Sequence, residues 1–187
     1  MVGLGNPGER YRRTRHNVGF LVVDELASRA GAARGREEAD AWVAPARIAG
    51  QDVLLCKPLT FMNRSGSSVE RLLAPYEARP EDVLVVVDDV ALELGHLRVR
   101  ERGTHGGHNG LRSLIESLGT EEYPRVRVGI RKGEPPADLA DYVLSDFPQE
   151  DVLVVQETIG WAADAVECVV ADGVPAAMNR FNGQRRS

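Results

Sequence analysis

The sequence predicts an α/β fold: a single-domain, three-layer sandwich in which helices flank a mixed central sheet. First, short apolar runs typical of strands alternate with segments that have the apolar spacing of helices. Second, residues 83–87 form a continuous apolar run, which is typical of a strand buried on both faces. Third, residues 96–102 and 125–130 alternate between apolar and polar positions, as half-buried strands do. The 187 residues suffice for one domain with a sizeable core.

Each predicted element is supported by its apolar spacing and, in most cases, by glycine or proline near its end. In chain order, the elements are strand 2–4, helix 17–30, strands 41–48 and 53–57, helix 65–73, strands 83–87 and 96–102, helix 111–118, strand 125–130 and helix 152–170. The helix at 152–170 has the clearest apolar stripe, which includes Val155, Ile159 and Val166. Residues 135–148 fit neither pattern and are a candidate lid.

The charge distribution is compatible with RNA binding, although the formal net charge is -5 and nucleic-acid binders are often basic. Basic residues form three clusters: Arg10, Arg12, Arg13 and Arg15; Arg98, Arg100 and Arg102; and Arg125, Arg127, Arg131 and Lys132. Acidic residues gather elsewhere, for example at 37–40 and 150–164. Because local potential rather than net charge guides a polyanion, a basic face on an acidic body suits this partner.

Other features of the composition favour a cytoplasmic protein. The hydrophobic fraction is 43% and the charged fraction 27%, as in ordinary globular proteins. No N-terminal stretch has the features of a secretory signal, and no apolar run approaches the length of a membrane span. Cys56 and Cys168 lie far apart in apolar runs, so buried free thiols are favoured over a disulfide.

Polar residues gather where the predicted strands end, which is where ligands bind in α/β sheets. Three such clusters lie at 5–17, 57–63 and 88–89, and a fourth, at 106–110, opens a helix. His16 lies just before a helix, where a histidine is either a cap, a surface residue or a general base.

A general base needs a partner that fixes its tautomer, and Asp88 or Asp89 at a strand end fits that role. The same aspartates otherwise form a solvated strand end. Asn6, Asn63 and Asn109 are candidates to position water or stabilise an oxyanion, or are turn residues and caps. Phe61 and Met62 are core residues, or they flank a base or an apolar peptide.

Glycines at 3, 5 and 8 match the dinucleotide-binding pattern G-x-G-x-x-G, but their context does not. The strand before them is barely three residues long, and the helical pattern begins only near Asn17. Pro7 also removes a backbone N–H where a phosphate needs one. We therefore favour a tight turn that needs glycine dihedral angles.

Two further chemistries are disfavoured. A zinc site at His105 and His108 lacks nearby cysteines and a suitably spaced third ligand. A serine nucleophile at Ser65 lacks the first glycine of the pattern G-x-S-x-G.

The motifs of the chain stand in a specific order: GLGNPG at 3–8 with Tyr11 and TRHN at 14–17; KPLTFMN at 57–63; GGHNGL at 106–111; and RVRVGI at 125–130. Their order and spacing resemble those of bacterial-type peptidyl-tRNA hydrolases across nearly the whole chain. This family cleaves the ester between peptide and tRNA and recycles peptidyl-tRNAs that the ribosome releases early. One such block is weak evidence, but four in order are highly specific.

The resemblance implies a role for each matching residue. His16 is then the general base, Asp88 holds it in its basic form, and Asn6 discriminates blocked from free aminoacyl groups. Asn63 and Asn109 contact the tRNA end and order the catalytic water. The resemblance places these residues on the substrate side: Tyr11, Phe61, Met62, His108, Arg98, Arg100 and Arg127. It implies the lid at 135–148 and neither metal nor cofactor, and we expect a monomer.

The chain departs from the family pattern at three places. Few residues precede the first glycine block, so we expect a short first strand. After Asp89, the run 90–93 (Val-Ala-Leu-Glu) replaces the usual leucine, aspartate and proline, and 102–105 replaces a more glycine-rich loop. These changes leave the shapes of both loops open, but they remove no proposed catalytic group.

The leading functional hypothesis is therefore an esterase that acts on peptidyl-tRNA. An aminoacyl ester is already activated, so a positioned water and one base suffice. Phosphate contacts would supply affinity for many tRNAs irrespective of sequence. The second hypothesis is a catalytically idle RNA-binding relative, against which the presence of His16 and Asn6 argues. A nucleotide-cofactor enzyme, the third, rests only on the glycine pattern.

Overall fold

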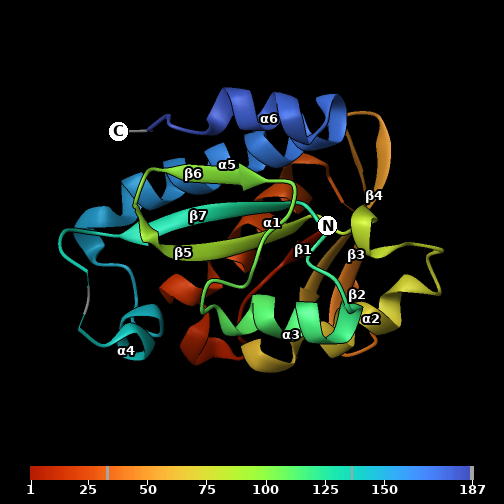
Figure 1. Cartoon of the computed structure of the whole chain (residues 1–187), viewed down its shortest axis with the longest axis horizontal. Helices are drawn as coiled ribbons and strands as arrows, with labels where there is room; N and C mark the ends of the chain where they lie inside the picture. Colours follow the sequence, from red (N-terminus) through yellow and green to blue (C-terminus); the bar gives the residue numbers. More distant parts are fainter. Residues whose placement is uncertain (33, 136, 186–187) are drawn as a thin grey trace.

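The structure, a computed structural model, describes residues 1–32, 34–135 and 137–185. A seven-stranded sheet of order β2-β3-β4-β1-β5-β7-β6 forms its middle layer (Figure 1). Its strands are β1 (Val2–Gly3), β2 (Arg36–Glu38), β3 (Ala41–Ile48), β4 (Gln51–Pro58), β5 (Val85–Glu93), β6 (Leu97–Arg100) and β7 (Arg125–Arg131). β1 is parallel to β4 and β5, and β5 is parallel to β7, whereas β2, β3 and β6 pair antiparallel. The predicted mixed sheet is confirmed.

Helices cover both faces of the sheet, which gives three layers. One face carries α1 (Val18–Arg29), α5 (Val152–Asp172) and α6 (Val174–Phe181); the other carries α2 (Ser65–Leu73) and α3 (Asn109–Leu118). In Figure 1, α5 and α6 lie above the sheet and α3 lies below it. The short α4 (Leu139–Val143) follows β7, and 3₁₀ turns include η1 (Glu9–Tyr11), η2 (Arg15–Asn17), η3 (Met62–Arg64), η4 (Pro80–Asp82) and η5 (Gln149–Asp151).

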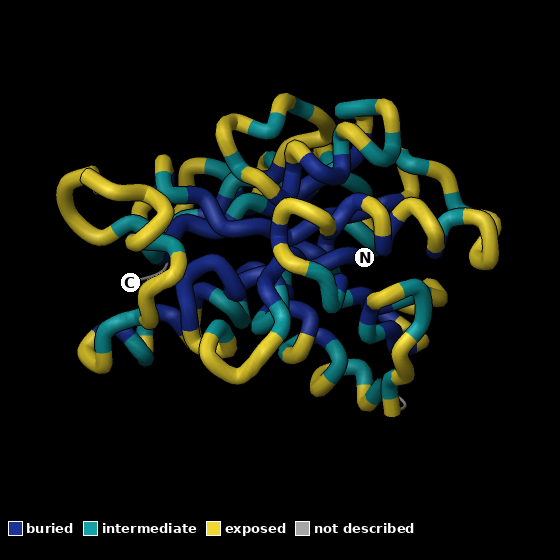
Figure 2. The backbone as a smooth tube through the Cα atoms, turned by 90° about the horizontal axis from the view of Figure 1, so that it is seen from below, coloured by how far each residue is buried: buried dark blue, intermediate teal, exposed yellow. Residues whose placement is uncertain are grey.

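β5 shows why the sheet needs two covered faces. Val86 packs in one apolar cluster with α1 and α5, whereas Val85 and Val87 pack in the other with α2 and α3. Successive strand residues point to opposite faces, so a strand covered on both sides is apolar at each position. Burying each valine contributes roughly 1.5–3 kcal/mol. Figure 2 shows buried segments through the middle of the molecule and exposed segments around them.

The crossing of α1 over β1 positions the turn that carries His16. A Cβ at Gly3 would lie 2.2 Å from the carbonyl oxygen of Gly19, and a Cβ at Gly19 would lie 2.5 Å from the backbone of Leu4. The helix and strand therefore touch through their backbones, which only glycine permits. This contact holds the start of α1, and with it η2, against the central strands.

The differences from the predictions concern strand ends and short elements. β5 continues to Glu93, with a register shift after Asp89, so Asp88 and Asp89 lie within the strand rather than beyond its end. The three-residue β2 and the helix α6 were not predicted, because the first is too short for a periodic signal and the second follows directly on α5. α4 occupies part of the segment 135–148.

Arg125 corrects the prediction of an exposed basic cluster at 125–132. Its side chain is 1% exposed, and its guanidinium donates hydrogen bonds to the carbonyl oxygens of Glu121 and Tyr123. It therefore stabilises a loop and is not available to a phosphate. By contrast, β6 has the predicted pattern, with Leu97 and Val99 buried and Arg100 exposed.

Two predictions about the chain as a whole can be compared with the structure. Cys56 and Cys168 are buried free thiols, as predicted. Among the described residues, no helix combines the length and the apolar character needed to cross a membrane.

Candidate active site

His16 and Asp88 form a buried pair, although 72 residues separate them in the sequence. His16 lies in η2, directly before α1, and Asp88 lies in β5. The His16 Nδ1 is 2.9 Å from the Asp88 Oδ1, and both residues are less than 10% exposed. The predicted contact between these two residues is therefore present.

His108, which the sequence placed on the substrate side, is a second histidine on the same carboxylate oxygen, and this contact was not predicted. It caps α3, and its Nδ1 accepts the backbone N–H groups of Gly110 at 3.1 Å and Leu111 at 3.3 Å. An acceptor nitrogen carries no proton, so the proton of the neutral ring is on Nε2. That Nε2 lies 2.9 Å from the Asp88 Oδ1 and donates to it. The signal was a histidine directly before a helix, in the position of a cap.

The environment of Asp88 keeps it ionised. Burial by itself would raise the pKa of its carboxyl group, but the adjacent His108 and His16 outweigh this effect and lower the pKa below its ordinary value. The carboxylate therefore accepts a hydrogen bond from the Nδ1–H of His16. The Nε2 of His16 is then left unprotonated, which is the state a general base requires.

A cavity of about 240 Å³ opens beside this group. His16, Asp88 and Asp89 line it together with Asn109, the first residue of α3, and Arg127 of β7. Residues of α4 form a further part of its wall, namely Leu139, Ala140 and Val143. The space beside the histidine–aspartate pair is thus polar on the strand side and apolar on the α4 side.

Arg127 is the cation of this cavity. Its Nε lies 3.0 Å from the Asp89 Oδ2, close enough for an ion pair but not aligned as a hydrogen bond. Its side chain is 23% exposed, so it points partly into the cavity rather than freely into solvent. Arg98 lies directly opposite Arg127 on the neighbouring strand, and Arg100 lies opposite Arg125. The predicted basic stripe therefore continues from the edge strand to the cavity.

Asn6 connects two of the sequence motifs. Its backbone N–H donates to the Asn17 Oδ1 at 2.8 Å, and the Asn17 Nδ2 donates back to the Asn6 carbonyl at 2.9 Å. Its own Oδ1 accepts the backbone N–H of Met62 at 2.8 Å. Asn6 therefore ties the first glycine turn to η2 on one side and to η3 on the other. Asn17 is a positioning residue that the sequence did not single out, although it belongs to the motif at 14–17.

Met62 corrects its predicted place on the substrate side. It is 4% exposed and belongs to the apolar cluster of α2 and α3. A Cβ at Gly110 would lie 2.5 Å from its sulfur atom. Met62 therefore packs η3 against α3 and leaves its two neighbours, Phe61 and Asn63, exposed.

The remaining candidates lie near the surface. Phe61 is 55% exposed, and Asn63 is exposed in η3, which packs against α3. Tyr11 is half-buried in η1, and the guanidinium of Arg10 lies 4.4 Å from its ring centre. The cavity beside His16 is lined by Asn109 but not by Asn63 among the described residues.

The donor set argues against a resident metal at the histidine–aspartate group. One ligand atom each from His16, Asp88 and His108 lies within 4.8 Å of the others. A metal on His108 Nε2 would require a proton on Nδ1, yet two backbone N–H groups point at that Nδ1. The hydrogen bonds of α3 therefore favour a proton, not a metal, between His108 and Asp88.

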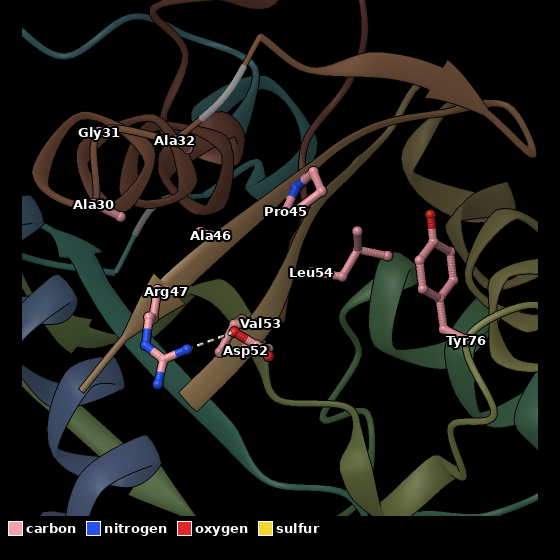
Figure 3. Close-up of a pocket in the computed structure, with 10 residues that line it drawn as sticks. All are labelled: Ala30, Gly31, Ala32, Pro45, Ala46, Arg47, Asp52, Val53, Leu54 and Tyr76. Carbon is pink, nitrogen blue, oxygen red and sulfur yellow. Dashed lines mark hydrogen bonds and ion pairs between the residues drawn. The ribbon is translucent and has the colours of Figure 1, made fainter. Parts of the chain in front are cut away.

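A more voluminous cavity lies away from this chemistry. It measures about 410 Å³ and is lined by the end of α1, the β3–β4 hairpin and Tyr76 (Figure 3). Its side chains are mostly aliphatic, and its charged pair, Arg47 with Asp52, is exposed on the hairpin. Size alone therefore does not identify the active site.

The comparisons with known proteins identify the family of the chain. The profile of the peptidyl-tRNA hydrolase family matches residues 1–187. A peptidyl-tRNA hydrolase of Chloroflexus aggregans is 51% identical over 185 residues, with 97% of each chain covered. One from Brevibacillus brevis is 43% identical over 186 residues, covering 100% of this chain and 98% of the relative. The crystal structure of the Acinetobacter baumannii peptidyl-tRNA hydrolase has a TM-score of 0.89 at 35% identity, covering 98% of this chain and 94% of that one.

Proposed function

This chain belongs to the peptidyl-tRNA hydrolase family, and we propose that it hydrolyses the ester that joins a peptide to the terminal ribose of tRNA. The observation that carries the proposal is the buried pair of His16 and Asp88 beside a polar cavity, in a chain that matches the family along its whole length. Its role would be to recycle peptidyl-tRNAs that the ribosome releases early.

The geometry supports a general-base mechanism. The Nε2 of His16 takes a proton from a water molecule, and the water oxygen attacks the ester carbonyl. The negative charge of Asp88 stabilises the imidazolium that forms. When the tetrahedral intermediate collapses, the ester bond breaks and the ribose oxygen leaves with the proton from His16. The products are a free peptide carboxyl group and a tRNA with a free ribose hydroxyl.

The asparagines supply neutral hydrogen bonds to this reaction. Asn109 lines the cavity and is placed to orient the water or to donate to the developing oxyanion. Asn63 lies exposed on η3, the turn packed against α3, and is suited to contact the tRNA end. Asn6 holds the glycine turn in place, and it would discriminate substrates with a blocked amino group from those with a free amino group. His108 acts through Asp88, which it helps to keep ionised.

Exposed rings and cations are suited to hold the tRNA. Phe61 and Tyr11 would stack on or border the acceptor end. Arg98 and Arg100 would pair with phosphates, and Arg127 would place a positive charge near the scissile ester. We also propose that the enzyme acts as a monomer. In this scheme it needs neither metal nor cofactor, and we propose that it acts in the cytoplasm.

The test is the release of tRNA from N-acetyl-aminoacyl-tRNA by the wild type and by His16→Ala. We expect the substitution to lower kcat/KM by about 10²–10⁴-fold, because general-base catalysis contributes that much. Equal rates would refute the role of His16. If the wild type binds tRNA in a salt-dependent way but releases none from the ester, the chain is an idle RNA-binding relative instead. Free aminoacyl-tRNA serves as the control substrate, and it should be cleaved much more slowly.

A further inference from the structure

Arg15 is buried although it belongs to a basic cluster at the surface. It precedes His16 in η2 and is 7% exposed, whereas Arg12 and Arg13 are exposed. Burial of a guanidinium is costly unless its donors are satisfied. The contacts of Arg15 therefore indicate what this part of the fold requires.

The hydrogen bonds of Arg15 join two segments that lie 130 residues apart in the sequence. Its Nη1 donates to the Ser145 Oγ at 2.5 Å, to the Ser145 carbonyl at 3.2 Å and to the Asp146 carbonyl at 2.8 Å. Its backbone N–H donates to the Ser145 carbonyl at 3.1 Å, and Thr14 forms an antiparallel bridge with Asp146. The turn that carries the base is thus bound to the chain just after α4.

Two aromatic rings complete the environment of the guanidinium. Its carbon lies 4.3 Å from the ring centre of Tyr142 and 5.4 Å from that of Phe147. Tyr142 belongs to α4, and its hydroxyl donates to the Ile130 carbonyl at 3.0 Å and accepts the Lys132 N–H at 3.1 Å. The same ring therefore fixes α4 to the end of β7 and to Arg15.

These contacts couple the base to a wall of the cavity. α4 contributes Leu139, Ala140 and Val143 to the cavity that contains His16 and Asp88. Because Arg15 is the residue before His16, a shift of α4 would be transmitted to the base. We propose that Arg15 is a positioning residue that holds α4 and the His16 turn together as one unit. The wall of the cavity and the general base then keep fixed positions relative to each other when the ester is bound. This inference rests on the proposed function and extends it to the segment 135–148.

The chemistry of the contact requires arginine. The three side-chain hydrogen bonds all come from Nη1, and the buried Nε has no hydrogen-bond partner among the described residues. The feature that lysine lacks is the planar group, which stacks on Tyr142 and Phe147 while it donates. A lysine ammonium keeps the positive charge but cannot both stack and reach Ser145 and Asp146. Arg15→Lys therefore isolates the geometric role from the charge.

The test compares Arg15→Lys with the matched variant Arg29→Lys. The guanidinium of Arg29 also joins two elements, because it binds the Gly160 carbonyl at 3.0 Å and Asp164 at 2.7 Å between α1 and α5. It lies outside the residues assigned to the site. The substrate is N-acetyl-aminoacyl-tRNA, and hydrogen exchange of the amides at 139–147 is measured on the same proteins.

We expect Arg15→Lys to lower kcat by about 10–100-fold, since a small misplacement of reacting groups can cost about 10²-fold. The shape of its pH profile should remain, because the pair of His16 and Asp88 is intact, and exchange at 139–147 should become faster. Arg29→Lys should change neither kcat nor this exchange by more than about twofold. If Arg15→Lys does not fold, Ser145→Ala should show the same effects in weaker form.

Unchanged kcat, or unchanged exchange at 139–147, would overturn the positioning role of Arg15. A loss of thermal stability without either change would mean that the contact is structural only. If the wild type releases no tRNA from the ester, the proposed function fails, and the exchange measurement still decides whether Arg15 holds α4.

Discussion

The substitution Asp88→Asn removes the charge of the central carboxylate and leaves its shape. The oxygen of an amide can still accept hydrogen bonds from His16 Nδ1 and His108 Nε2, which both lie 2.9 Å from the Asp88 Oδ1. The imidazolium that His16 becomes during catalysis then has no counter-charge. The variant therefore measures the electrostatic part of the interaction rather than its packing.

The expected magnitude follows from the geometry. The two delocalised charges would be centred about 4 Å apart, which corresponds to roughly 4 kcal/mol at an effective dielectric constant near 20. Since about 1.4 kcal/mol is a factor of ten in rate, we expect kcat/KM to fall by roughly 10²–10³-fold.

The assay is tRNA release from N-acetyl-aminoacyl-tRNA between about pH 5 and 9, with binding of uncharged tRNA as the control. Binding should be little changed, because Asp88 is only 4% exposed and is not placed to contact phosphates. A rate within about threefold of the wild type across this pH range would refute the reasoning for Asp88.

Acid stability gives an independent check on the same carboxylate. The pKa of Asp88 is lowered from its ordinary value of 3.8, so its ionised form stabilises the fold above that pH and this contribution is lost as the pH falls below it. We expect the free energy of unfolding in urea to fall more steeply for the wild type than for Asp88→Asn between about pH 4 and 2. Parallel pH dependences of the two proteins would contradict the lowered pKa.

Three further predictions concern packing, burial and charge. Gly66→Ala should lower the free energy of unfolding by about 1–3 kcal/mol, because its Cβ would lie 2.1 Å from a backbone oxygen of α3. As the control, Gly160→Ala meets only the end of the Arg29 side chain and should lower the free energy of unfolding by less than about 1 kcal/mol. Equal losses in the two variants would contradict this prediction. Burial raises the pKa of Cys56 to about 12, so a thiol reagent at pH 8 should label its peptide only in urea, as mass spectrometry can establish. Arg100→Ala should reduce the salt slope of tRNA binding by about one, whereas Arg47→Ala on the β3–β4 hairpin should leave it unchanged.

Local patterns of apolar and polar residues predict much of the architecture. The continuous apolar run at 83–87 and the alternating strands at 96–102 and 125–130 predicted a mixed sheet with covered faces, and the structure contains that sheet. Periodicity records which face of an element a residue occupies, so these predictions needed no long-range information. The ends of β5 and the short β2 were missed because hydrogen bonds to neighbouring strands, not local spacing, define them.

The candidate site was predictable in part for the same reason. The ordered motifs contain His16 and Asn109, and Asp88 follows a predicted strand; the structure places all three around one cavity. Which atoms touch was not predictable. His108 reaches Asp88 because α3 begins beside β5, directly after His108, and Met62 faces the core because η3 turns its side chain toward α3.

The sequence on its own therefore decided the fold class, the family and the candidate for the general base, because these depend on residue types and on their spacing. The tertiary structure alone decided that one carboxylate oxygen serves two histidines, that Arg125 is buried in a loop, and that Arg15 binds the chain after α4. The contacts of Asp88 join segments 72 and 20 residues apart, and the contact of Arg15 joins segments 130 residues apart. Their distances are set by the packing of helices on the sheet, which no local pattern encodes. His16 is a histidine before a helix in the sequence, and the packing gives it the partner it needs.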